Sequence, residues 1–166
     1  MEFIRAIPSF IKRVFRAILC FIRKIFGRCV PDVNTVMTDS TVRAAIEDAW
    51  NDSNPNAPEV PPNPPPGIKQ EQGGWVIYDC CNQTYQIIRV TGGTRDRLPT
   101  IVRTRPNVSH PEYLVAWFHT HPNTVAEGYA QGPSPADIQF THNSARVPGI
   151  VRSHDGYHLI NLPKSS

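Results

Sequence analysis

The sequence predicts an α+β fold, an α/β sandwich in which helices flank one curved sheet. Three observations support this class: a helix-like stretch precedes a series of short β-like runs, a second helix interrupts that series, and two further runs follow it. With 166 residues the chain can hold one domain of ordinary size and an appendage. We therefore expect residues 1–30 to be an appended helix and residues 31–166 to be one folded domain.

The first 30 residues combine apolar side chains at helical spacing with Lys and Arg on the opposite face. This segment holds seven Lys or Arg and one acidic residue, Glu2, whereas the whole chain has a net charge of +3. A basic amphipathic helix is typical of a segment that lies in a membrane interface. Docking on the protein's own core, or binding of residues 1–28 to a chaperone or immunity partner, remains an alternative. Its longest uncharged run, Ala17–Ile22, is too short to span a bilayer, and its interrupted apolar region is a poor signal peptide.

The elements of the folded domain follow in order along the chain. Thr38–Trp50 is predicted to be a helix that Asp39 or Ser40 caps, and the proline-rich residues 51–67 are predicted to be an extended surface spacer. A second helix is expected from Pro135 to about Ala145, with Ser134 as its cap. The remaining runs alternate or are β-branched and predict strands at Trp75–Cys80, Tyr85–Thr91, Thr100–Thr104, Tyr113–Thr120, Gly149–Arg152 and Tyr157–Leu162.

A pair of histidines near the end of one predicted strand indicates a metal site. His119 and His121 are one residue apart, so an extended backbone points both rings to the same side. Asp137, in the first turn of the next helix, offers a third ligand and leaves a fourth position open, as in catalytic zinc sites. Each residue also has an ordinary alternative role: a partly buried histidine, or a helix cap for Ser134 and Asp137.

The motifs together resemble those of the JAMM (JAB/MPN-type) metalloproteases: an upstream glutamate, then His-x-His, then Ser-x-x-Asp. Here they read Glu71, His119-Thr120-His121 and Ser134-Pro135-Ala136-Asp137, within a resemblance that covers residues 39–162. The chain looks closest to a bacterial branch found in polymorphic toxins and secreted effectors. The resemblance implies a JAMM/cytidine-deaminase-like curved mixed sheet with flanking helices.

The same resemblance implies the role of each site residue. His119, His121 and Asp137 would bind Zn²⁺, Glu71 would carry the proton of the attacking water, and Ser134 would stabilise the oxyanion. One departure from the family is the longer spacing of twelve residues between His121 and Ser134. We expect residues 123–131 to form a longer loop at the rim of the site. His142, on the same helix as Asp137, is a weaker candidate for a position beside the ligands.

The predicted function is therefore a zinc-dependent peptidase or isopeptidase, deployed as a bacterial effector or toxin, that acts on a protein or peptide. The alternative is a membrane-associating binding protein with a non-catalytic JAMM-like domain, which would have no need of Glu71. Nucleic acid is not an expected partner, because the positive charge is confined to the N-terminal segment. Nucleobase deamination is excluded, since it needs a His-x-Glu together with a Pro-Cys-x-x-Cys, and this chain has no Pro-Cys-x-x-Cys.

The four cysteines have no zinc-knuckle spacing, and Cys80 and Cys81 would point to opposite faces of a strand. The sequence favours unpaired thiols, with a Cys20–Cys29 disulfide left open. Without a secretory signal, four cysteines favour synthesis in the reducing bacterial cytoplasm. We expect either peripheral membrane association there or delivery without a classical signal peptide.

Overall fold

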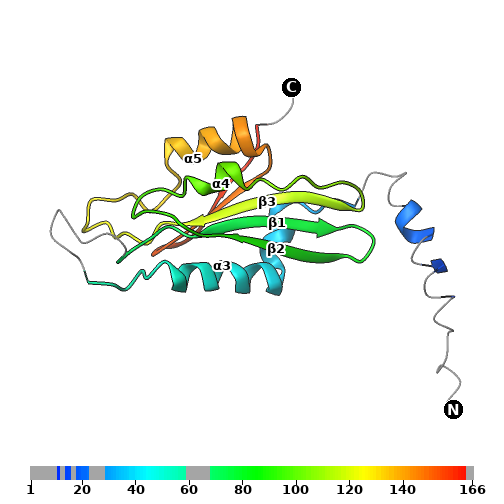
Figure 1. The fold of residues 1–166 in the computed structure, drawn as a ribbon, viewed down its shortest axis with the longest axis horizontal. Coiled ribbons are helices and arrows are strands. Elements are labelled where there is room, and N and C mark those ends of the chain that lie inside the picture. The colour runs from blue at the N-terminus through cyan, green and yellow to red at the C-terminus, as the bar shows by residue number, and fades with distance from the viewer. Residues whose placement is uncertain (1–10, 12–13, 16–17, 23–28, 59–67, 164–166) are drawn as a thin grey trace, which may run out of the picture.

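The computed structural model describes residues 11, 14–15, 18–22, 29–58 and 68–163. In this part of the chain a mixed five-stranded sheet lies between helices on its two faces (Figure 1). The predicted α+β class is confirmed.

The sheet has the strand order β2-β1-β3-β4-β5. Its strands are β1 (Gly73–Asp79), β2 (Thr84–Val90), β3 (Glu112–Thr120), β4 (Gly149–Ser153) and β5 (Gly156–Ile160). β3 and β4 run parallel, and every other neighbouring pair is antiparallel. A parallel pair needs a crossover connection, and the segment between β3 and β4 supplies it with a helix on one face of the sheet. The end of β3 therefore lies between β1 and β4, at the centre of the sheet.

Two helices cover the other face, α2 (Val33–Thr38) and α3 (Ser40–Asp52). The predicted helix Thr38–Trp50 corresponds to α3, which starts later because Asp39 is extended and caps it by accepting from the amides of Thr41 and Val42. α3 buries one apolar stripe against the sheet. The core on this face includes Val42, Ile46, Ala49, Val76, Ala116 and Phe118.

The crossover face carries α4 (Thr100–Arg103), α5 (Pro135–Phe140) and the π-helical turn η1 (Thr141–Ala145), which continues α5. The expectation of a strand at Thr100–Thr104 is wrong, because these residues form α4. Thr100 Oγ1 donates to the Thr91 carbonyl, and Thr104 Oγ1 donates to carbonyls of the turn itself. Ile101 is buried with Trp75 and Trp117 in the core of this face. This tertiary burial outweighs the weak strand preference of the β-branched residues.

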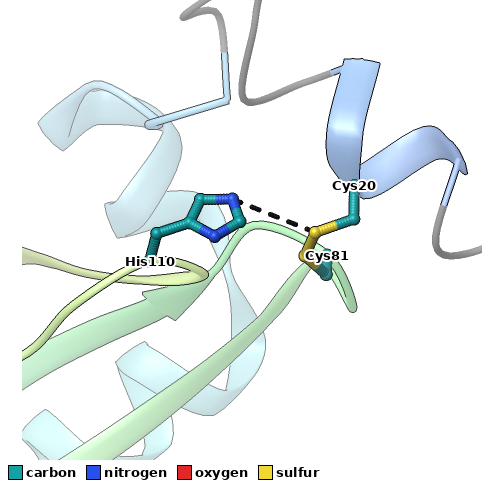
Figure 2. Close-up of side chains that lie close together, drawn as sticks. All are labelled: Cys20, Cys81 and His110. Carbon is teal, nitrogen blue, oxygen red and sulfur yellow. Dashed lines mark hydrogen bonds between the residues drawn. A yellow bond between two sulfur atoms is a disulfide. The ribbon is translucent and has the colours of Figure 1, made fainter.

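All four cysteines are paired, as Cys20–Cys81 and Cys29–Cys80, so the expectation of unpaired thiols is wrong. Cys80 and Cys81 lie in the turn after β1 and not in a strand, so the alternation of strand side chains does not restrict them. Figure 2 shows the Cys20–Cys81 bond beside His110, whose Nε2 lies 3.9 Å from Cys20 Sγ. The disulfides attach the N-terminal segment to the β1–β2 hairpin.

The described part of the N-terminal segment is helical at residues 11, 14–15 and 18–22. All its large apolar side chains there are exposed: Ile11, Val14, Phe15, Ile18, Leu19, Phe21 and Ile22. No helix within the described ranges is long and apolar enough to cross a membrane. Residues 1–10, 12–13, 16–17 and 23–28 of the predicted helix, and residues 59–67 of the proline-rich segment, lie outside the described residues, whereas residues 29–30 are described and are not helical. Residues 51 and 52 of that segment end α3.

Candidate metal centre

The two histidines stand where β3 ends. His119 pairs with Gly73 of β1 and Val151 of β4, and the amide of His121 donates to the carbonyl of Arg152 at 2.8 Å. A side chain on Gly73 would be forced within 2.4 Å of the Phe118 carbonyl oxygen, so this position requires glycine. The extended backbone sends both rings toward α5, as the sequence predicts.

The rings are close together and share a carboxylate. Nε2 of His119 lies 2.8 Å from Nε2 of His121. Asp137 presents Oδ1 at 3.2 Å from the first nitrogen and Oδ2 at 3.4 Å from the second. The structure thus brings together the three predicted metal ligands.

Asp137 is held in place by the start of its own helix. Ser134 is the N-cap of α5: its Oγ accepts from the Asp137 amide at 3.2 Å, while its own amide donates to Asp137 Oδ2 at 2.7 Å. Ser134 Oγ also donates to Asp137 Oδ2 at 2.7 Å. Burial acts to raise the pKa of Asp137, but the hydrogen bonds from His119 and His121 outweigh it and lower the pKa well below the usual range. Asp137 is therefore a carboxylate at neutral pH.

Glu71 lies beside these three residues although it is far from them in sequence. Its amide donates to the Thr94 carbonyl, and the next residue, Gln72, pairs with Thr120 through both of its backbone groups. Glu71 Oε1 then lies 4.0 Å from His121 Nε2, in a residue that is only 6% exposed. Burial, followed by the nearby Asp137 and Asp96 carboxylates, raises the pKa of Glu71 to about 9.

The residues present fit a divalent cation. One atom from each of Glu71, His119 and His121 can be chosen so that all three lie within 4.8 Å of one another. Burial lowers the pKa of His119, so its ring is neutral at pH 7, and its Nδ1 is buried without a hydrogen-bond partner among the described residues. Two imidazoles and a carboxylate are ligands that suit Zn²⁺.

A cavity of about 430 Å³ opens onto these groups. The predicted site residues Glu71, His119, His121, Ser134 and Asp137 all line it. The loop expected at the rim is there as well, and it contributes Asn123, Tyr129 and Ala130 to the lining.

That loop is secured by a buried ion cluster that sequence reasoning missed. Glu127 Oε2 lies 2.7 Å from Lys69 Nζ, and Glu127 Oε1 lies 2.9 Å from Arg95 Nη2. The side chains of Lys69 and Glu127 are each only 4% exposed. No local pattern could have revealed this cluster, because its members lie on three separate segments.

Four other histidines have roles outside the site. His142 faces the Asn161 carbonyl at 3.1 Å and does not line the cavity, so the structure does not place it beside the ligands. His154 lies 3.0 Å from the Pro122 carbonyl, and His158 lies 2.7 Å from Asp155. His110 lies near the Cys20–Cys81 disulfide (Figure 2).

No family model, curated protein or solved structure matches this chain.

Proposed function

We propose that this protein is a zinc-dependent peptidase or isopeptidase of the JAMM type, which hydrolyses an amide bond with an activated water. One observation carries the proposal: Glu71, His119, His121 and Asp137 come from three separate segments and converge in one cavity. A helix cap or a buried histidine would account for one of these residues, but neither accounts for all four.

The ligand residues would be His119, His121 and Asp137. A bound Zn²⁺ would polarise the scissile carbonyl and lower the pKa of a bound water to about 7. The α5 capping box holds Asp137 in position, and the ring of Trp117 stacks on His119 with the centroids 4.8 Å apart. Both ligands are thus oriented before substrate arrives, which precise metal chemistry requires.

Glu71 is suited to carry the proton. A general base must reach the attacking water, and Glu71 lies at the edge of the cluster and lines the same cavity. Burial raises the pKa of Glu71, so it holds a proton in the metal-free protein. A bound cation would favour its carboxylate form, which is the form that accepts a proton from water. The same carboxyl would then deliver that proton to the leaving amine.

The proposed role of Ser134 depends on where its hydroxyl donates. Its hydroxyl has one proton, which goes to Asp137 in this arrangement. We propose that Ser134 positions the ligand carboxylate and that stabilisation of an oxyanion requires its hydroxyl to turn toward the substrate.

The alternative proposal is a membrane-associating binding protein with a non-catalytic domain. Its membrane association is favoured by the exposed apolar side chains among residues 11, 14–15 and 18–22 and by the basic charge of residues 1–30. Membrane association by itself is compatible with the peptidase proposal. The disulfides attach this segment to the hairpin turn, and seven residues of β1, about 20 Å of strand, separate that turn from the site (Figure 1). Bound to an anionic membrane, the segment would leave the cavity open to a protein substrate. Two disulfides are typical of oxidising compartments, which supports deployment of the protein as a delivered bacterial effector or toxin.

The test is to measure zinc content and peptide cleavage for wild type, Glu71→Gln, His121→Ala and Asp137→Asn. We expect about one zinc per chain in wild type and in Glu71→Gln, with cleavage reduced by a factor of roughly 100 to 10,000 in the latter. His121→Ala and Asp137→Asn should lose both zinc and cleavage. His142→Ala, an imidazole removed outside the cavity, is the matched control and should retain both. Wild-type protein that binds no zinc, or full cleavage by Glu71→Gln, would overturn the proposal.

A further inference from the structure

The cavity that holds the metal centre also has an apolar part, here called the apolar wall. Beside the ligands it is lined by Trp117 and Phe140, and beyond them by Leu98, Pro99, Ile101 and Val102 on and before α4. Of these side chains the mechanism proposed above uses only Trp117, which orients His119.

The wall is rigid close to the ligands. Phe140 meets Trp117 edge-on with ring centroids 4.8 Å apart, and Trp117 in turn stacks on His119. The indole Nε1 of Trp117 donates to Thr141 Oγ1 at 3.0 Å, so its polar group is satisfied inside the protein. The part of Trp117 that lines the cavity is therefore apolar.

α4 supplies the outer end of this wall. Ile101 is buried beneath the helix, whereas Val102 is 58% exposed although it lines the cavity. The Thr100 and Thr104 hydroxyls fix this short helix in position. An exposed valine beside a preformed apolar wall can bury further surface only when a ligand covers it.

The cavity also has polar lining. Asn123 and Tyr129 belong to the loop that Glu127 secures, and Asn123 itself exchanges hydrogen bonds with Arg95. Asp96 and Arg97, directly before Leu98, also line the cavity, so polar and apolar groups lie around the same metal centre. A site with both kinds of lining orients a ligand, because the apolar part of the ligand is favoured against the apolar lining.

We infer that Trp117, Phe140, Leu98, Ile101 and Val102 form a subsite for a large apolar side chain next to the scissile amide. The inference rests on the proposed function and names its substrate class: peptides with Leu, Met or Phe beside the cleaved bond. One methylene group more or less in an apolar pocket changes the ratio of kcat/KM values between two substrates by about 10- to 200-fold.

The test measures the binding of two probes, acetohydroxamate and phenylacetohydroxamate, to the zinc-loaded protein. Both carry the same hydroxamate group, which chelates the metal. Calorimetry should show that the phenyl compound binds at least about 10-fold more tightly. Val102→Asp should abolish this preference while leaving zinc content and acetohydroxamate affinity unchanged. The matched control is Val125→Asp, because Val125 is 70% exposed and does not line the cavity; its preference should equal that of wild type.

The outcomes separate the two proposals. Equal affinity of wild type for both hydroxamates, or an unchanged preference in Val102→Asp, would overturn the subsite and leave the peptidase proposal standing. Failure of both hydroxamates to bind would overturn the metal centre and the subsite with it. In a peptide library, wild type should select Leu, Met or Phe at one position, and Val102→Asp should shift that position toward Lys or Arg.

Discussion

Glu71→Gln should stabilise the metal-free protein while it removes catalysis. Glu71 is buried, and that burial, reinforced by Asp137 and Asp96, raises its pKa from 4.5 to about 9. In the unfolded chain the same carboxyl loses its proton near 4.5. Between these two values the folded state must keep a proton that the unfolded state releases, so wild-type stability falls as pH rises. Glutamine has the shape of the protonated acid and does not titrate, so the stability of the variant should not fall with pH in this way.

The magnitude follows from the pKa shift. About 2.5 pH units separate pH 7 from the ordinary value, and each unit is worth 1.36 kcal/mol, so the variant should gain up to about 3 kcal/mol at pH 7. Its advantage should be close to zero near pH 4.5 and should grow until about pH 9. This is the opposite of the usual carboxylate, whose lowered pKa contributes stability that is lost as pH falls.

The assay is urea denaturation of wild type and Glu71→Gln in a chelator, at pH 5, 7 and 8.5. Asp48→Asn, at an exposed position on α3, is the control and should stay within about 0.5 kcal/mol of wild type at each pH. With saturating Zn²⁺ the pH dependence of the difference should shrink, because a nearby cation favours the carboxylate form. A variant whose advantage does not change between pH 5 and pH 8.5 would refute the reasoning about the burial of Glu71.

Three further outcomes are expected. Glu127→Gln leaves Lys69 buried without its charge partner, so the free energy of unfolding, measured by chemical denaturation, should fall by about 3 kcal/mol. Asp52→Asn breaks the exposed Arg89–Asp52 pair and should lower it by less than about 1 kcal/mol. Equal losses in the two variants would mean that the Lys69–Glu127 cluster does not secure the loop. Cys29→Ser removes a crosslink between residues separated by 51 positions and should lower the free energy of unfolding by about 2–4 kcal/mol, an effect that a reducing agent should reproduce in wild type; if neither changes stability, the bond is not closed in solution. Full-length protein should sediment with anionic vesicles at low salt and less at high salt. The reason is that each surface Lys or Arg contributes about 1 kcal/mol of attraction to the anionic membrane, and salt ions screen this attraction. If a chain lacking residues 1–28 sediments equally, this segment does not bind the membrane.

Local sequence patterns predicted the elements that carry the proposed metal ligands. Alternation and β-branching indicated β1 and β3, and the spacing of His119 and His121 required only an extended backbone to bring both rings to one side. Ser134 followed by proline indicated where α5 begins, since a cap depends on backbone groups within the next turn. These predictions succeeded because the forces that they use act between near neighbours in the chain.

The contacts that complete the site were decided by the tertiary structure. No spacing rule places Glu71 beside His121, and that expectation came from a resemblance and not from periodicity. The strand predicted at Thr100–Thr104 became α4 because burial of Ile101 against Trp75 and Trp117 outweighs local preference. The cysteine pairing and the Lys69–Glu127 contact were likewise beyond sequence reasoning. The physical reason is common to all of them: each joins residues that are separated along the chain by tens of positions, and only the packed sheet brings such residues within reach of one another.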